Sequence, residues 1–429
     1  LKIINFVYNI SFIDIFRFFI SYIYTDNNIF SLYFPFVSLM FRSIPIAKGV
    51  VKMTSKERVL AAINHQKPDK IPTDLGTTNC TSIAKITYDK LKDKLNIRTS
   101  EDKFLFRPFQ IMQCDEEILK FLQIDTRALP GDYEAYEQKE WIDERTYRDR
   151  FGIVYKMPEN GLYFDFYSAP LEKFDSVEEI EANYTWPDPV IPAEVKGLRE
   201  KAKKLYEENE YALVGDIVNS GIWERSQNLR GFQQLLIDIM INKDIAHYIL
   251  RHMTDHQKAR MKQYLGEVGE YLDVVFVGDD FAMSQGPVMS LDVFREMVKP
   301  YLEEYYAFIK EMAPHAKLMY HSCGSIIPFI DDLIEIGVDI LNPIQVNAAG
   351  MDTKALKERF GDRIVFWGAI DAHEVMPKGT TEDVKREVER RICDLGPEGY
   401  VLCENHNIQA DVPVENVITM YLHAKEYSL

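Results

Sequence analysis

The chain has 429 residues, which is enough for one large α/β domain and too many for a small module. Its composition, 46% hydrophobic and 27% charged, is that of an ordinary globular protein. A formal charge of −17 argues against nucleic acid and anionic membranes as partners.

The first 52 residues differ from the rest of the chain, because they are very rich in Phe, Ile and Tyr. Ile3–Tyr24 has the length of a membrane span but contains Asp14 and Arg17. A secretory signal needs a basic start and a small-residue cleavage site, and neither is clear. AT-rich DNA encodes the same residue types, so we expect residues 1–52 to be a non-native extension from a gene-start error. A membrane-associated segment is the alternative.

From Met53 onward, short apolar strands alternate with amphipathic helices, which is typical of a parallel α/β sheet. Eight strands in such an order predict a (β/α)8 barrel, the TIM-barrel fold, over residues 53–429. The strands are expected at Lys70–Leu75, Ile124–Leu129, Tyr211–Ile217, Asp273–Val277, Lys317–His321, Val338–Asn342, Ile364–Gly368 and Tyr400–Cys403. The clearest helices are expected at Ser55–His65, Leu291–Met312, Ile326–Ile336, Thr353–Arg359, Thr381–Asp394 and Val414–Glu426.

A long insertion, roughly Pro130 to Glu210, separates the second and third predicted strands. It alternates like antiparallel strands and then becomes helical from Ala193. We expect it to cover part of the barrel mouth and to influence the choice of substrate.

Polar residues follow nearly every predicted strand, at the ends where barrel enzymes place their chemistry. Asp279 and Asp280 are expected to include a catalytic residue that orients the substrate or a ligand, although either could simply cap the next turn or helix. Four further residues at these ends are expected to bind substrate or cofactor, namely Asn79, Gln285, Gln345 and Asp371.

The fifth predicted strand ends in His321-Ser322-Cys323, which points the imidazole and the thiol the same way. A soft thiolate beside an imidazole suits zinc. The third ligand would come from the end of the last strand, as Cys403 or His406, and both remain open. Three protein ligands and one free position are typical of a catalytic zinc site. The alternative is a hydrogen-bonded structural histidine beside a small buried cysteine.

The other three cysteines, Cys80, Cys114 and Cys393, are expected to be structural. An odd number of widely spaced cysteines without a secretory pattern predicts reduced thiols in a cytoplasmic protein.

Several of these segments resemble the uroporphyrinogen decarboxylase superfamily. The opening Ser55–Ala62, followed by Lys67–Pro72, is similar to the start of that family's domain. The motifs Gly278-Asp279-Asp280, Gln285-Gly286, Lys299-Pro300-Tyr301, His321–Gly324 and His406–Pro413 continue the likeness. The resemblance covers about residues 53 to 429 and implies a (β/α)8 barrel.

The superfamily contains two chemistries. Its decarboxylases carry an arginine-rich segment after the first strand that binds the carboxylates of a tetrapyrrole, whereas Thr73–Cys80 has no arginine. Its cobamide-dependent methyltransferases, from anaerobes, carry zinc on a His-x-Cys pair and a later Cys. His321 and Cys323 match the pair, but His406 aligns with the later Cys and Cys403 precedes it by three residues. A His at that place also occurs in the decarboxylase branch.

The resemblance therefore implies a zinc-dependent methyltransferase that moves a methyl group between a small methylated substrate or thiol and a corrinoid held by a partner protein. Zinc would lower the pKa of a thiol or polarise the methyl donor as a Lewis acid. Glu404 would be catalytic by transiently filling the open zinc position. The alternatives are a metal-free decarboxylase and a non-catalytic binding protein with a barrel fold.

Overall fold

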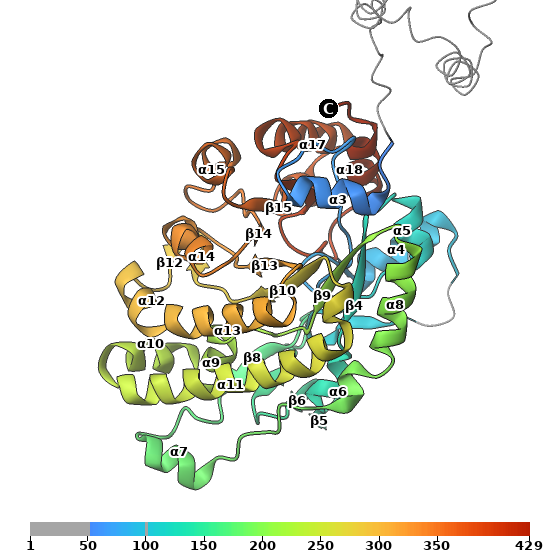
Figure 1. Cartoon of the computed structure of the whole chain (residues 1–429). Helices are drawn as coiled ribbons and strands as arrows, with labels where there is room; N and C mark the ends of the chain where they lie inside the picture. The colour runs from blue at the N-terminus through green and yellow to red at the C-terminus, as the bar shows by residue number, and fades with distance from the viewer. Residues whose placement is uncertain (1–51, 99–101) are drawn as a thin grey trace, which may run out of the picture. The chain divides into compact units, whose positions relative to one another are not determined.

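Seven parallel strands form the main sheet of the structure, a computed structural model that describes residues 52–98 and 102–429 (Figure 1). They are β4 (Thr126–Pro130), β9 (Ala212–Asp216), β10 (Val274–Gly278), β13 (Lys317–His321), β14 (Ile340–Asn342), β15 (Val365–Ile370) and β16 (Tyr400–Glu404). Each strand pairs in parallel with its successor along the chain, as in a TIM barrel. The predicted α/β barrel fold is confirmed.

The first predicted strand closes this sheet without becoming a regular strand itself. On one side, Leu402 of β16 donates its N–H to the Pro72 carbonyl (2.9 Å) and accepts the Asp74 N–H (3.1 Å). On the other side, Asp125 donates its N–H to the Thr73 carbonyl, also at 3.1 Å. Proline has no N–H to offer a ladder, which explains why the pairing is reduced to an isolated bridge. The segment nevertheless joins β16 to β4 and occupies the first of the eight strand positions of the barrel.

The buried carboxylate of Asp74 binds this closing segment to its surroundings. It accepts hydrogen bonds from Thr126 Oγ1 (2.6 Å), Thr77 Oγ1 (2.8 Å) and Trp367 Nε1 (3.0 Å). Thr126 lies on β4 and Trp367 on β15, so one side chain connects three parts of the wall. Burial raises the pKa of the Asp74 carboxyl group, and the three donors oppose that effect.

Alternate residues of each strand fill the inside of the barrel with apolar side chains. Helix α3 (Ser55–Ile63) packs against β4, β9 and β16 and contributes Val59 and Ile63 to this interior. It begins with a capping box between Thr54 and Glu57. The interior cluster comprises Val59, Ile63, Ala212, Val214, Val274, Phe276, Met319, Ile340, Val365, Trp367, Val401 and Cys403. The N-terminal end of the barrel is therefore filled, which leaves the C-terminal end for a site.

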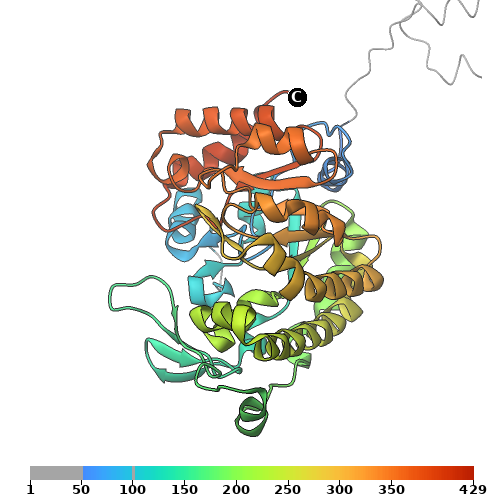
Figure 2. The same ribbon diagram turned by 90° about the vertical axis from the view of Figure 1, so that its left-hand side faces the viewer.

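Helices surround the sheet (Figures 1 and 2). The principal ones are α4 (Lys85–Leu95), α5 (Glu116–Phe121), α9 (Trp223–Arg230), α10 (Phe232–Ile241), α11 (Lys243–Val268), α12 (Leu291–Met297), α13 (Lys299–Met312), α14 (Ile330–Glu335), α15 (Thr353–Phe360), α17 (Thr381–Leu395) and α18 (Val414–Glu426). The expected helix Leu291–Met312 is divided at Val298, because Pro300 cannot continue the hydrogen-bonding pattern of a preceding turn.

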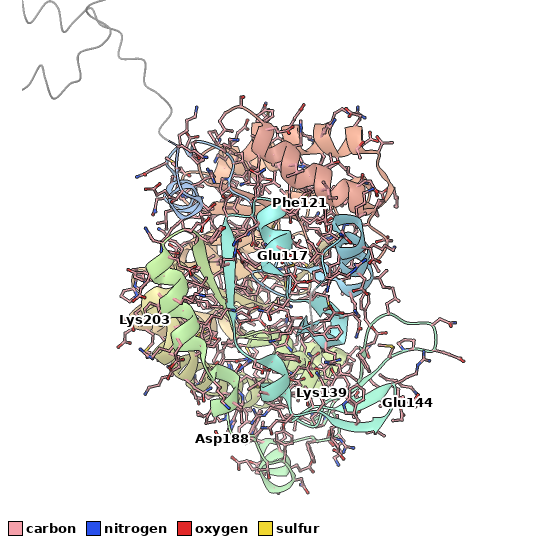
Figure 3. The ribbon with its side chains drawn as sticks, turned by 90° about the vertical axis from the view of Figure 1, so that its right-hand side faces the viewer. Glu117, Phe121, Lys139, Glu144, Asp188 and Lys203 are labelled. Carbon is pink, nitrogen blue, oxygen red and sulfur yellow. The ribbon has the colours of Figure 1, made fainter. Side chains whose placement is uncertain are left out.

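The insertion between β4 and β9 has the predicted order of antiparallel strands followed by a helix. Its strands are β5 (Glu140–Asp143), β6 (Thr146–Arg148), β7 (Val154–Lys156) and β8 (Asp165–Ser168), and its helices are α6 (Tyr133–Glu137), α7 (Val177–Asn183) and α8 (Leu198–Glu208). Figure 2 shows the four-stranded sheet projecting at one side of the barrel. In Figure 3, Lys203 of α8 and Glu117 of α5 mark the charged outer surface over β4.

A smaller sheet follows the closing segment and contributes to the site. Its strands are β1 (Ile83–Ala84), β2 (Phe104–Phe106) and β3 (Ile111–Met112), in the order β1-β3-β2. The predicted extension, residues 1–52, lies outside the described residues except for Lys52. In the described part of the chain, none of the helices has the length and apolar character that crossing a membrane requires.

Replacing Asp74 by alanine would leave three buried donors without their acceptor. A buried donor without a partner costs about 1–3 kcal/mol. We therefore expect Asp74→Ala to lower the free energy of unfolding by about 3 kcal/mol or more, measured by urea denaturation. Asp352→Ala is the control, because it removes an exposed capping carboxylate from α15 and should cost less. Equal losses in the two variants would contradict the role given to Asp74.

Candidate metal centre

Three side chains with metal-binding atoms converge at the C-terminal end of the barrel. His321, Cys323 and His406 each offer one ligand atom, and these atoms lie within 4.8 Å of one another. His321 Nε2 is 3.4 Å from Cys323 Sγ, and the two imidazole rings have centroids 6.1 Å apart. Within residues 52–98 and 102–429, no other group of at least three His, Cys, Asp or Glu side chains meets this criterion.

The turn after β13 holds Cys323 beside His321. Asp280 Oδ1 accepts the Cys323 N–H at 2.7 Å, and Gln345 Oε1 accepts the Gly324 N–H at 2.7 Å. Gly324 has φ +86°, and a Cβ at this position would lie 2.5 Å from the Ala282 carbonyl oxygen. The turn therefore requires glycine, and two polar side chains from neighbouring loops fix its path.

Asparagine side chains orient both histidines. Asn342 Nδ2 donates to the Trp367 carbonyl, which leaves its Oδ1 to accept from His321 Nδ1 at 2.7 Å. Asn407 Oδ1 lies 2.9 Å from His406 Nδ1 in the same way. A protonated Nδ1 leaves the Nε2 lone pair of each ring free, which is the state a metal ligand needs.

The chemistry of this trio fits zinc. Two imidazole nitrogens and one thiolate are ligands that zinc prefers, and three protein ligands leave a fourth position free. Burial raises the pKa of the Cys323 thiol, and the charges of Asp280, Cys80 and Glu224 raise it further. Burial and the neighbouring His321 lower the pKa of His406. A divalent cation would therefore have to displace the proton of Cys323 but would meet a neutral His406.

The structure distinguishes the two candidates for the third ligand. His406 belongs to the loop after β16 and joins the cluster, whereas Cys403 is buried in the barrel interior with Met319 and Trp367. Cys403 Sγ donates to the Glu404 carbonyl at 3.3 Å. Strand alternation points Cys403 inward at a deeper level, and the loop then returns His406 to the barrel axis.

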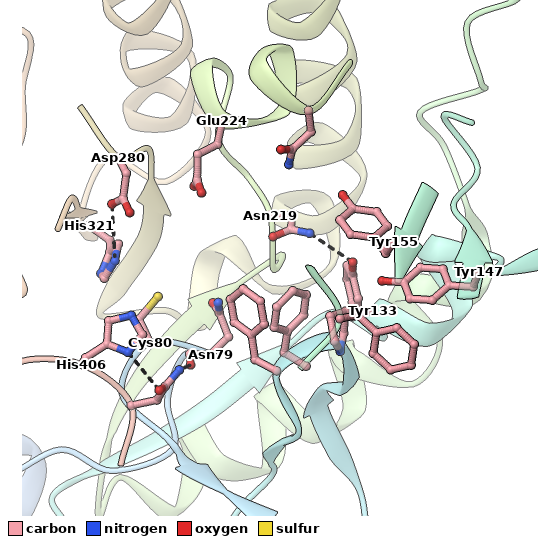
Figure 4. Close-up of a pocket in the computed structure, with 16 residues that line it drawn as sticks. Asn79, Cys80, Tyr133, Tyr147, Tyr155, Asn219, Glu224, Asp280, His321 and His406 are labelled. Carbon is pink, nitrogen blue, oxygen red and sulfur yellow. Dashed lines mark hydrogen bonds and ion pairs between the residues drawn. The ribbon is translucent and has the colours of Figure 1, made fainter. Parts of the chain in front are cut away.

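A cavity of about 140 Å³ opens beside the trio (Figure 4). Aromatic residues of the insertion and of the small sheet form its far wall, while carboxylates, amides and histidines form the wall nearest the trio. The lining residues are Asn79, Cys80, Phe106, Pro108, Phe109, Tyr133, Tyr147, Tyr155, Phe164, Asn219, Glu224, Asn228, Asp280, His321, His406 and Asn407. Asn79 and Asp280 are thus the two predicted residues, besides the histidines, that reach it.

Asp279 turns away from the cavity and caps a helix. Its carboxylate accepts the N–H groups of Ile222 (3.0 Å) and Glu224 (2.7 Å) at the start of α9. Burial raises the pKa of Asp279 to about 7, although those backbone donors favour the charged form. Of the two adjacent aspartates, one therefore supports the helix that carries Glu224 and the other faces the site.

Glu404 lies on the outer side of β16, where both of its carboxylate oxygens are buried without a hydrogen bond. Burial raises its pKa well above the usual value, and the charges of Asp411 and Asp371 add to this effect. Glu404 does not line the cavity, so its predicted entry into the metal site would require a rearrangement of the end of β16.

The remaining predicted binding residues also lie away from the cavity. Gln285 is exposed in the hairpin between β11 (Ala282–Met283) and β12 (Gly286–Pro287). Asp371 accepts the His373 N–H at 2.8 Å and the Glu374 N–H at 3.0 Å, and so caps the chain after β15. Gln345 acts only through the turn at Gly324. Their positions give these residues structural contacts, and a role in binding stays a prediction.

Sequence reasoning missed Glu224 and Cys80, which both line the cavity. Glu224 is open to the cavity yet surrounded by protein, and burial together with Asp280 and Asp279 raises its pKa well above the usual value. It lies in the first turn of α9, and no local motif marks it. Cys80 ends the polar run after the closing segment, a position that could have been read as part of the site.

Comparison with known proteins gives one family match. The family model described as Uroporphyrinogen decarboxylase (URO-D) matches residues 154–427, more than half of the chain. No curated protein sequence matches significantly.

Among solved structures, a methyltransferase from Methanosarcina mazei is similar with a TM-score of 0.62 and 17% identity, over 87% of this chain and 99% of that one. At this identity the likeness shows the fold. A GH10 xylanase from termite gut (10% identity, 53% and 64% of the two chains) and xylanase 10B from Thermotoga maritima (16%, 53% and 78%) both have TM-scores of 0.33. Those values are too low to support any conclusion.

Asp216, at the end of β9, lies near the Asn79–Cys80 turn with both carboxylate oxygens buried. Among the described residues, none donates a hydrogen bond of normal geometry to either carboxylate oxygen, although the Asn79 N–H is close enough to act on the carboxylate charge. Burial raises the pKa of Asp216 to about 7, against the opposing charge of Arg260 and the Asn79 N–H.

A carboxyl group with a raised pKa binds more protons in the folded state, so stability falls as pH rises from about 4, the unfolded pKa, to about 7. We expect Asp216→Asn, which stays neutral, to raise the thermal midpoint at pH 8 and to change it little at pH 4. At pH 8, the free energy of unfolding would rise by an amount on the order of 1–4 kcal/mol. Asp362→Asn, at an exposed site, is the control. Parallel pH profiles for wild type and Asp216→Asn would refute the expected protonation.

Proposed function

Because this chain belongs to the uroporphyrinogen decarboxylase family, we propose that it is an enzyme of that family's methyltransferase type that depends on zinc. It would transfer a methyl group between a small methylated substrate or a thiol and a corrinoid carried by a partner protein. The observation that carries this proposal is the convergence of His321, Cys323 and His406. The fold shared with the Methanosarcina mazei methyltransferase supports it.

The cavity's size and charge argue against tetrapyrrole decarboxylation. Two carboxylates, Glu224 and Asp280, line it, and no lysine or arginine does so within the described residues. A substrate with many carboxylates would meet like charges without a guanidinium partner. Its volume of about 140 Å³ is close to the roughly 150 Å³ that accommodates a benzene molecule in another protein. Both properties favour a small substrate without multiple negative charges.

The residues of the chain would divide the work at this site. His321, Cys323 and His406 would hold zinc, which when bound lowers the pKa of a coordinated thiol or polarises the oxygen or nitrogen of a methyl donor. Asp280 would position Cys323 by accepting the Cys323 backbone N–H. Asn342 and Asn407 would keep the Nε2 atoms of His321 and His406 directed into the site.

The far wall would position the organic part of the substrate. Phe106 packs edge-on to Tyr133 with ring centroids 5.0 Å apart, and Tyr147 stacks on Tyr155 at 5.2 Å. Such a wall excludes water and favours a compact apolar or aromatic group. Glu224, whose pKa burial raises well above the usual value, would donate a proton to the departing group. The corrinoid would approach from the open barrel mouth on its partner protein.

Metal analysis tests the centre directly. For protein purified without oxygen, we expect about one zinc per chain, and we expect Cys323→Ser and His406→Ala to lose most of it, because two ligands bind zinc much more weakly than three. Cys403→Ala and the exposed Cys393→Ser should retain it. Mass spectrometry of metal content is the measurement. Loss in Cys403→Ala with retention in His406→Ala would reverse the assignment of the third ligand.

A transfer assay tests the chemistry. Zinc-loaded protein is mixed with methylcobalamin and a panel of small thiols under anaerobic conditions, and cob(I)alamin formation is followed by absorbance. We expect turnover with at least one thiol, and a loss of at least about 100-fold in Cys323→Ser, because the metal that activates the thiol is gone. The same preparations are incubated with uroporphyrinogen. Carbon dioxide release by metal-free protein, with no methyl transfer, would replace this proposal with the decarboxylase alternative.

A further inference from the structure

We propose that Cys80 is a fourth, displaceable ligand of the metal held by His321, Cys323 and His406, so that a second thiolate closes the resting centre. This inference rests on the proposed function, because it presupposes a metal at the trio. The resting metal site would then have four protein ligands instead of three, and a substrate would bind the metal by displacing Cys80.

The position of Cys80 brings its thiol to the metal-binding side of the cavity. Cys80 lines the same cavity as His321 and His406, and Figure 4 labels all three among the residues that surround it. It is also close enough to Cys323 for a charge on Cys80 to raise the pKa of the Cys323 thiol. A thiol from the first barrel position therefore faces the trio, which comes from the fifth and eighth positions.

The turn that carries Cys80 is attached to the loop that carries His406. Asn407 Nδ2 donates to the Asn79 carbonyl at 3.2 Å, while the Oδ1 atom of the same amide lies 2.9 Å from His406 Nδ1. Thr78 Oγ1 accepts the Cys80 N–H at 3.2 Å and fixes the turn from the other side. One amide thus orients a histidine ligand and positions the backbone next to Cys80.

Cys80 packs against the apolar interior cluster, but its thiol differs from those of three other cysteines in its hydrogen bonding. Cys114 Sγ lies 3.6 Å from Ser82 Oγ, Cys393 Sγ lies 3.4 Å from Tyr427 Oη, and Cys403 Sγ donates to the Glu404 carbonyl. Within the described part of the chain, no hydrogen bond involves the Cys80 thiol. A half-buried thiol that faces a cavity without a partner is available as a ligand.

The surrounding charges favour a cation next to Cys80. Burial raises the pKa of the Cys80 thiol, and the charges of Asp216, Asp280 and Glu224 raise it further. Within residues 52–98 and 102–429, no lysine or arginine lines the cavity. A bare thiolate is therefore disfavoured here, whereas a divalent cation would stabilise the thiolate and the carboxylates together.

Cys80 would be the weakest ligand of the four. It is not part of the trio whose ligand atoms already lie within 4.8 Å of one another, so its sulfur must move inward by rotation of its side chain or a shift of the turn. A substrate thiol would reverse this movement. Cys80 would release zinc as the substrate sulfur took its place, and the proton of the substrate thiol would pass to the Cys80 sulfur.

Cobalt substitution provides the test, because thiolate-to-Co(II) charge-transfer absorption increases with the number of bound thiolates. Protein reconstituted with Co(II) should show two thiolates. Cys80→Ser should reduce the band to about half, whereas Cys323→Ser, which is expected to lose most of its metal, should lose most of the band. Cys393→Ser, far from the site on α17, should leave it unchanged. An intact band in Cys80→Ser, with loss in Cys323→Ser, would overturn the inference and leave the proposed function standing. No Co(II) binding by wild type would overturn both.

Alkylation of the unmodified sequence covers the case in which Cys80→Ser fails to fold. Native protein is treated with iodoacetamide with and without zinc, and modified cysteines are identified by mass spectrometry. We expect zinc to protect Cys80 and Cys323 together at least about tenfold, while Cys393 reacts equally in both samples, because a metal-bound thiolate is a poor nucleophile. Protection of Cys323 alone would show that Cys80 is not a ligand.

Discussion

Closure of the barrel by Pro72–Asp74 is the constraint on which the site depends. This segment lies between β16 and β4, with hydrogen bonds to both sides. The Asp74 carboxylate accepts hydrogen bonds from Thr126 of β4 and Trp367 of β15, and a third from Thr77 in the turn that follows the segment. Because the first position of the barrel is next to the eighth, the turn that follows it meets the loop after β16. The contact between Asn407 and Asn79, which are 328 residues apart, is a direct result.

The interior of the barrel determines how deep each site residue lies. Apolar side chains fill the lower levels, down to α3, and include Cys403. On three strands a polar residue follows two positions farther along, with His321 after Met319, Asp216 after Val214 and Asn342 after Ile340. A thiol at the lower level is part of the core, whereas an imidazole from the loop above it reaches the cavity. Depth along the barrel axis therefore decides which of two chemically suitable residues can bind a metal.

The charge distribution of the site is consistent with a cation at its centre. Glu224 and Asp280 line the cavity beside the trio and Asp216 lies near Cys80, while two buried arginines pair with other carboxylates. Arg260 forms a buried ion pair with Glu194, and Arg225 Nη1 lies 3.0 Å from Asp149 Oδ2. Uncompensated carboxylates in a buried site are costly unless they lose their charge or meet a cation. A cavity that binds a polycarboxylate would need basic side chains, whereas this one is lined by Glu224 and Asp280.

The sequence predicted the barrel because its strands and helices alternate with clear periodicity, and seven of the eight strands lie where this pattern placed them. The remaining predicted strand, Lys70–Leu75, is irregular because Pro72 interrupts its hydrogen-bonded ladder. Hydrophobicity alone does not reveal this local effect. Residues within one turn of each other, such as His321 and Cys323, could be paired from strand alternation. Glu224 could not, because it reaches the cavity from a helix whose position depends on the capping of α9 by Asp279.

By itself, the sequence determined the order of strands and helices, the insertion before β9 and the pairing of His321 with Cys323, since each depends on neighbouring residues. Only the tertiary structure decided that His406 rather than Cys403 completes the trio and that Cys80 faces it. It also showed that Asp279, Glu404, Gln285, Gln345 and Asp371 lie away from the cavity. The reason is physical: closure of a barrel sets distances between residues hundreds of positions apart, and such distances leave no local pattern in a chain.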